Sequence, residues 1–304
     1  MLVFEILTSI ILPIFVLIGV GVLVDRTLKP DLRTLTKLNF HVFVPALIFM
    51  KIFEADIRPG EMAQVAGVTL VHLLLLCGFG YAVFSRPAWR AHRPVLTAGT
   101  VFYNAGNYGI PFVGLAFGPE YIGVIAVVLM VQNLLNFTLG IWLFHHRSQG
   151  VGAVLKAFVK VPVIPAILLA VGLRYLQAAT AFSLPPAIAV PLGHLSDGLI
   201  PVALLTLGVQ LSRIRIGEGW RPLSALVVMR LLLSPALALA LVVFFGIEGT
   251  LAAVLIAAAG LPMAVNVYIL ASEYGEDAAL ASQGVFWTTL LSAGTLTLLL
   301  RFLV

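Results

Sequence analysis

The stretch Asn104-Ala-Gly-Asn-Tyr-Gly-Ile-Pro111 interrupts an apolar run from 94 to 117, and Gly260-Leu-Pro262 interrupts a second run from 249 to 272. Proline inside a helix removes one hydrogen bond and clashes with the carbonyl four residues earlier. In hydrocarbon, the freed backbone groups need partners within the protein or a water-filled cavity. We therefore predict two broken helices whose backbone and amide groups face a polar cavity. A simple proline kink is the alternative.

Composition makes a lipid bilayer the relevant solvent for these runs. The chain has 304 residues, of which 61% are hydrophobic and only 10% are charged, whereas soluble domains contain about 25% charged residues. The net charge of +5 does not indicate a nucleic-acid-binding face, because the basic residues form short clusters between apolar runs. The single cysteine, Cys77, can form no internal disulfide.

A membrane-spanning helix needs about 20 mostly apolar residues. We identify ten segments of this kind, joined by short connections: 4–24, 34–53, 61–84, 94–117, 121–145, 155–177, 186–211, 221–245, 249–272 and 279–303. Residues 1–24 lack the basic region and the cleavage site of a signal peptide. We expect them to form the first spanning helix.

The basic residues predict how these segments are oriented. If all ten segments span the membrane, 13 basic residues fall on one side and four, Lys51, Arg58, Arg174 and Arg301, fall on the other. Excess lysine and arginine mark the cytoplasmic side. This pattern predicts an integral membrane protein with both termini outside the cytoplasm.

The prolines also indicate an internal repeat. Pro45 and Pro111 are 66 residues apart, and Pro201 and Pro262 are 61 residues apart, in the second and fourth segments of each half. Five segments per half force the second half to enter the membrane inverted, an arrangement common in transporters. We predict an all-α membrane protein with two inverted five-helix repeats, 1–147 and 148–304, in which the fourth and ninth helices are broken and cross.

Four stretches resemble the auxin efflux carrier family across nearly the whole chain. Residues 104–112 resemble its fourth-helix motif, and residues 260–266, followed by Ala271-Ser-Glu-Tyr274, resemble its ninth-helix motif. The runs Arg230-Leu-Leu-Leu-Ser-Pro235 and Thr288-Thr-Leu-Leu-Ser292 also look like that family.

The resemblance implies a PIN-like bacterial member of the bile acid/auxin/arsenite transporter superfamily, located in the cytoplasmic membrane. The first, second, sixth and seventh segments would form a scaffold, often dimeric, and the other six would form a transport core. A small organic anion would bind where the broken helices cross and would move by alternating access. The chain lacks the long loop after the fifth helix of plant auxin exporters, and it has Val265-Asn-Val267 where they carry a second proline, which disfavours auxin itself.

Uncharged amides near the two breaks are the candidate substrate ligands. Asn104 and Asn107 are three residues apart and share a helix face. Each amide offers two donors and an acceptor, so it could bind a carboxylate or a cation. Alternatively, the amides only satisfy the broken backbone. The candidate substrate site comprises Asn104, Asn107, Pro111, Gln132, Asn133, Pro262 and Asn266, with Asn136 one turn after Gln132.

Four further residues are candidates for ion coupling or charge pairing. Asp197 could carry a proton, or could simply be solvated near the outer end of its segment. Arg230 could pair with a carboxylate substrate, bind backbone carbonyls or reach the cytoplasmic surface. His72 could titrate or could be a hydrogen-bonded structural histidine. Gln283, with Thr288, is the rough counterpart of the amides in the segment 121–145.

The sequence contains no His-Glu-x-x-His, Gly-x-Ser-x-Gly or Gly-x-x-x-x-Gly-Lys motif. We therefore expect a protein that is not an enzyme, with no cofactor and no metal site, although Na⁺ or H⁺ could act as a coupling ion. The resemblance implies a small organic anion and a second copy in a homodimer as partners, and the composition adds membrane lipid. The alternatives are a sodium- or proton-coupled symporter of the bile-acid-transporter type and a receptor that binds its ligand without transport.

Overall fold

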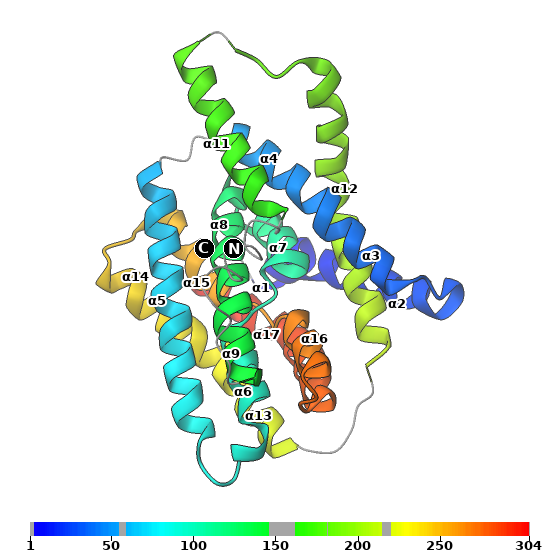
Figure 1. Ribbon diagram of the computed structural model, residues 1–304, viewed down its shortest axis with the longest axis vertical. Coiled ribbons are helices and arrows are strands. Elements are labelled where there is room, and N and C mark those ends of the chain that lie inside the picture. The colour runs from blue at the N-terminus through cyan, green and yellow to red at the C-terminus, as the bar shows by residue number, and fades with distance from the viewer. Residues whose placement is uncertain (1–2, 55–58, 146–161, 181, 215–219, 304) are drawn as a thin grey trace.

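The computed structural model describes residues 3–54, 59–145, 162–180, 182–214 and 220–303, and in these residues the chain is helical without a β-strand (Figure 1). The basic residues Arg58, Arg147, Lys156, Lys160 and Arg215 of the orientation count lie outside the described residues.

The helices before residue 146 are α1 (Val3–Ile6), α2 (Leu12–Leu28), α3 (Leu32–Leu38), α4 (Val44–Glu54), α5 (Pro59–Phe84), α6 (Arg93–Val101), α7 (Ile110–Ala116), α8 (Ile122–Leu135) and α9 (Ile141–His145). The later helices are α11 (Val163–Ala179), α12 (Pro186–Ser212), α13 (Trp220–Val228), α14 (Ser234–Phe244), α15 (Gly249–Ala259), α16 (Val265–Glu273) and α17 (Ala278–Leu303).

Seven of the ten predicted segments are helices long and apolar enough to cross a membrane, within the described part of the chain: Val3–Leu28, Leu32–Glu54, Gly60–Phe84, Pro119–Phe144, Pro186–Ser212, Trp220–Phe244 and Ala278–Leu303. The predicted segments 94–117 and 249–272 are each divided into two shorter helices. The segment 155–177 is described only from its later part, as α11. The count of ten spanning segments stays a prediction.

Wide π-helical turns join several of these helices, and four of the five in the described residues end two residues before a proline. These four turns are η1 (Leu7–Ile11), η2 (Asn39–Phe43), η4 (Ala105–Gly109) and η7 (Met229–Leu233), and the prolines are Pro13, Pro45, Pro111 and Pro235. Proline has no N–H and its ring crowds the preceding turn. Widening that turn relieves the crowding without breaking the helix, and such turns often occur at functional sites.

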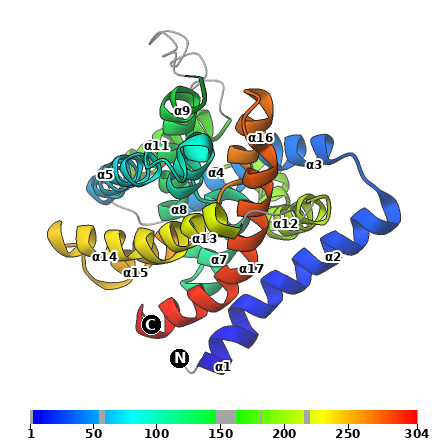
Figure 2. The ribbon, with the colours of Figure 1, turned by 90° about the horizontal axis from the view of Figure 1, so that it is seen from below.

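Helices α2 and α12 pack with their backbones in contact, and Figure 2 views α12 end on beside α2. A Cβ added at Gly21 would lie 2.9 Å from the Cα of Gly208, and one added at Gly208 would overlap the carbonyl of Ile18. Small residues allow this close approach between helices in a membrane. At the ends of these helices, Arg213 forms an ion pair with Asp25, with 2.6 Å between Nη2 and Oδ1.

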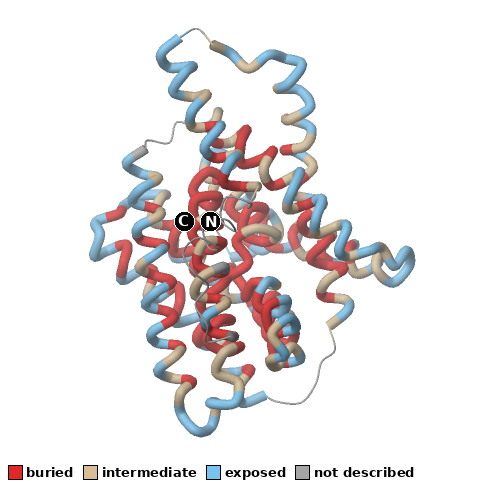
Figure 3. The backbone as a smooth tube through the Cα atoms, viewed as in Figure 1, coloured by how far each residue is buried: buried red, intermediate tan, exposed pale blue. Residues whose placement is uncertain are grey.

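Buried residues gather in the centre of the molecule, while the outer ends of α2, α11 and α12 are exposed (Figure 3). Many large apolar side chains nevertheless lie on the outside, such as Phe4, Leu168, Phe244 and Phe302. A soluble protein would bury most of these side chains. Their exposure on helices of this length identifies an integral membrane protein.

Candidate functional site

The two interrupted segments meet through their backbones. The amide N–H of Asn104 donates to the carbonyl of Pro262 at 2.8 Å, and the N–H of Ala264 donates to the carbonyl of Phe102 at 2.9 Å. This short antiparallel bridge lies between α6 and η4 in one segment and between α15 and α16 in the other. Each break therefore supplies hydrogen-bond partners for the other.

One side chain supports the remaining N–H group at the middle of each break. Gln132, on α8, accepts a hydrogen bond from the N–H of Tyr103 at 3.0 Å. Thr288, on α17, accepts one from the N–H of Met263 at 3.0 Å. The amide of Gln132 thus satisfies the broken backbone through its oxygen, which leaves its nitrogen available for another partner.

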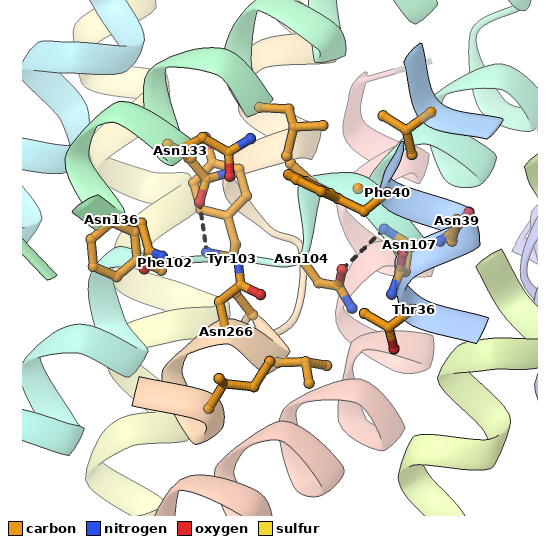
Figure 4. A pocket seen from close by; sticks show the side chains of 18 of the residues that line it. Thr36, Asn39, Phe40, Phe102, Tyr103, Asn104, Asn107, Asn133, Asn136 and Asn266 are labelled. Atoms are coloured by element: carbon orange, nitrogen blue, oxygen red, sulfur yellow. Dashed lines mark hydrogen bonds between the residues drawn. The ribbon is translucent and has the colours of Figure 1, made fainter. Parts of the chain in front are cut away.

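A cavity of about 90 Å³, here called the crossing pocket, lies against the bridge. None of the described residues that line it is charged. Its amide and small hydroxyl side chains are those of Thr36, Asn39, Asn104, Asn107, Gln132, Asn133, Asn136, Gln210 and Asn266. Figure 4 shows Asn104, Asn133 and Asn266 around the same space.

Three buried amide groups in the crossing pocket carry donors that have no partner among the described residues. These are Nδ2 of Asn104, Nε2 of Gln132 and Nδ2 of Asn133, in side chains of residues that are only 7%, 4% and 4% exposed. A buried donor left unpaired costs about 1–3 kcal/mol. A bound molecule that accepts hydrogen bonds would recover this free energy. Three acceptor atoms, on Asn39, Asn136 and Gln210, likewise find no partner in the part of the chain that the structure describes.

Two helix N-termini lie at the crossing pocket. Asn104 caps the N-terminus of η4, which continues into α7, and its side chain accepts from the N–H of Asn107 at 3.2 Å. Ala264 caps the N-terminus of α16. Both capping residues line the crossing pocket. Since helix N-termini carry partial positive charge, the pocket favours an anion although its described lining has no charged side chain.

A larger cavity of about 880 Å³, here called the vestibule, adjoins the crossing pocket and shares Thr36 and Gln210 with it. Its lining includes Arg33, Lys37 and Arg213. These three residues are among the 13 basic residues that the orientation count predicts to lie on the cytoplasmic side. The vestibule therefore places three basic side chains and one carboxylate, Asp31, next to the crossing pocket.

The structure brings together five of the seven predicted substrate ligands: Asn104, Asn107, Gln132, Asn133 and Asn266. Pro111 is buried in α7 and does not line the crossing pocket. Pro262 takes part through its backbone carbonyl.

The four residues considered for coupling or charge pairing lie outside the pocket lining. Asp197 is exposed on α12, and Gln283 is buried on α17. The ring of His72 lies 3.0 Å from the carbonyl of Ser234, measured from Nε2. Arg230 binds backbone carbonyls, one of the alternatives that the sequence left open.

Sequence reasoning did not select Thr36, Asn39 or Gln210, which also line the crossing pocket. Asn39 donates from Nδ2 to Oδ1 of Asn107 at 2.7 Å, joining η2 to η4. A signal was present, because Asn39 and Gln210 are amides within apolar segments, as is Gln132. Neither lies near a Gly-Pro break in the sequence, and only the fold brings them there.

Comparison with known proteins agrees with this description. The family described as membrane transport proteins matches residues 151–300. A transporter of uncharacterised function from Methanothermobacter thermautotrophicus is 27% identical over 280 residues, covering 89% of this chain and 88% of its own. A Rhizobium meliloti protein, named as a proposed malonate transporter, is 24% identical over 305 residues, covering 97% and 95%.

These matches confirm the resemblance that the motifs around Pro111 and Pro262 predicted. Residues 151–300 match the membrane transport protein family, and relatives aligned over nearly the whole chain are named as transporters.

Proposed function

We propose that this chain carries a small carboxylate anion across the cytoplasmic membrane by alternating access, as a secondary transporter or uniporter. The observation that carries the proposal is the set of unpartnered amide donors on Asn104, Gln132 and Asn133 in a pocket whose described lining has no charged residue. Carboxylate oxygens accept several hydrogen bonds at once. Neutral donors with helix N-termini bind an anion and release it again more readily than a fixed positive charge does.

The vestibule supports access from the cytoplasmic side. Arg33 and Lys37 are exposed on α3, and both line the vestibule. Positive charge at the mouth of a cleft raises the local concentration of anions and speeds their entry. In this proposal, the charged residues attract the substrate and the uncharged amides bind it.

The proposed architecture is the inverted repeat of two five-helix halves, with both termini outside the cytoplasm. The fourth and ninth segments cross in a core, and the core moves against a scaffold that includes α2, α4, α11 and α12, with a second copy of the chain completing a homodimer. Two features support it: the reciprocal backbone bonds between the breaks and the close backbone packing of α2 on α12.

The test is uptake of radiolabelled malonate and related mono- and dicarboxylates into proteoliposomes. Malonate is the first probe because one relative is named as its proposed transporter. Asn133→Ala is the informative variant, since the Nδ2 donor of this side chain has no partner among the described residues, and the bridge bonds between the two breaks involve other residues. We expect about 10-fold lower flux, because a hydrogen bond to a charged group contributes about 1.5–3 kcal/mol.

Gln64→Ala is the matched control, because it deletes an exposed amide on α5 outside the crossing pocket. We expect it to transport like the wild-type protein. Substrate binding without flux under any imposed gradient would favour the receptor alternative. Flux that survives Asn133→Ala unchanged would contradict the proposed site.

A further inference from the structure

Arg230 is the largest side chain that is fully buried in the described residues. It lies in the wide turn η7, between α13 and α14, and is 0% exposed. Its guanidinium carbon lies 4.8 Å from the centroid of the Tyr103 ring, so it is directly behind the bridge between the two interrupted segments. It does not line the crossing pocket.

The guanidinium is held by oxygen atoms from both interrupted segments. Its Nη1 donates to the carbonyl of Thr100 at 2.5 Å and contacts the carbonyl of Val101 at 3.4 Å. Its Nη2 donates to the carbonyl of Ala259 and to the hydroxyl of Ser234. We call these three carbonyls and one hydroxyl the oxygen cage.

Two helix C-termini supply the negative partial charge of the oxygen cage. Thr100 and Val101 are the last residues of α6, and Ala259 is the last residue of α15. A helix C-terminus carries roughly half a negative elementary charge, so the two ends together match one positive charge. No carboxylate among the described residues forms an ion pair with Arg230. The two helix ends and the Tyr103 ring therefore compensate the positive charge of Arg230.

Oxygen atoms at the C-terminal ends of broken helices are also the ligands with which secondary transporters hold a coupling sodium ion. We propose that Arg230 is a tethered cation that fills this place, so that the oxygen cage binds no sodium and transport does not require it. Arg230 is then a positioning residue: it holds the two C-terminal helix ends together, which fixes the N-terminal ends that face the crossing pocket. The part of this inference that concerns transport rests on the proposed function.

The first measurement is thermal unfolding of the purified wild-type protein in sodium chloride and in choline chloride at equal ionic strength. We expect equal melting temperatures, because the cage is already occupied. Flux of malonate into proteoliposomes should likewise be unchanged when choline replaces sodium. Stabilisation by sodium, or flux that depends on it, would overturn the inference.

The second measurement removes the charge. Arg230→Ala should lower the melting temperature by about 10 °C, because it leaves the buried carbonyls at two helix ends without the cation that compensates them. Millimolar methylguanidinium should restore at least half of this loss, and sodium should now stabilise the variant. A merely space-filling role for Arg230 would give no rescue by a soluble cation.

Two further variants keep the test decisive if Arg230→Ala does not fold. Arg230→Lys retains the charge and Arg230→Met retains only apolar volume, so the lysine variant should melt at the higher temperature. Arg221→Ala is the matched control, because Arg221 is exposed at the start of the same helical segment. Equal behaviour of the lysine and methionine variants would contradict the inference. Melting needs no substrate, so this result stands even if the proposed transport fails.

Discussion

The two interrupted segments share a backbone arrangement but differ in their polar side chains. In each, one helix ends, a few extended residues bridge to the other segment, and a side chain on a neighbouring helix accepts the central N–H. Gln132 has this role for the first break and Thr288 for the second. Both breaks therefore meet the same requirement: backbone groups that are freed inside a membrane need hydrogen-bond partners within the protein.

The difference lies in what faces the crossing pocket. The first half of the chain contributes most of its amides, among them Asn104, Asn107 and Asn133, whereas the segment around the second break contributes Asn266. Thr288 accepts its backbone bond and donates to the carbonyl of Gly284, so it has no donor left for a ligand. The comparison teaches that the fold repeats while the binding chemistry is concentrated in one half.

The largest expected effect separates the two breaks directly. Asn104→Ala should lower malonate flux by more than about 10-fold, because it removes a buried ligand donor and the cap of η4. Asn266→Ala should lower it by only about threefold, because this side chain is exposed. The measurement is initial uptake into proteoliposomes. Equal losses would mean that the two breaks contribute equally to binding.

The next test compares the two supporting side chains. Gln132→Leu and Thr288→Val each leave one buried N–H without its acceptor, which should cost about 1–3 kcal/mol of stability and lower the melting temperature. Only Gln132→Leu should also weaken malonate binding, measured by calorimetry. If Thr288→Val weakened binding as much, the asymmetry between the halves would be wrong.

A smaller effect is expected where η2 meets η4. Asn39→Ala removes the 2.7 Å hydrogen bond to Asn107, and such a bond contributes about 1 kcal/mol, or about fivefold in an equilibrium. We expect this bond to stabilise the conformation with an open vestibule. The test uses the Ser282→Cys variant in a Cys77→Ala background, and its thiol should react more slowly with a maleimide when Asn39→Ala is added. Ser282 lines the vestibule. An unchanged labelling rate would mean that the bond between Asn39 and Asn107 does not favour the conformation with an open vestibule.

The smallest effect is expected at Asp197. This carboxylate is exposed on α12 and lines neither the crossing pocket nor the vestibule. Asp197→Asn should therefore leave both malonate flux and its dependence on an imposed proton gradient unchanged. Loss of proton-driven flux would assign Asp197 the coupling role that the sequence left open.

The sequence by itself determined the class of protein and the positions of the breaks. Its apolar content requires a bilayer, and the Gly-Pro stretches before Pro111 and Pro262 cannot continue a regular helix. Most of the candidate ligands followed, because an amide beside a break in a membrane needs a polar neighbour. These inferences depend only on local chemistry, which a sequence records.

Tertiary structure alone decided which polar groups meet. Gln210 reaches the crossing pocket because α12 packs against η4, and Asn39 reaches it beside Asn107, to which it is hydrogen-bonded. No local sequence pattern encodes either contact. Arg230 could have paired with substrate, reached the surface or bound carbonyls, and its position behind two helix ends selected the third. The reason is physical: a buried charge or amide is governed by the groups that lie around it, and folding brings these groups together from distant parts of the chain.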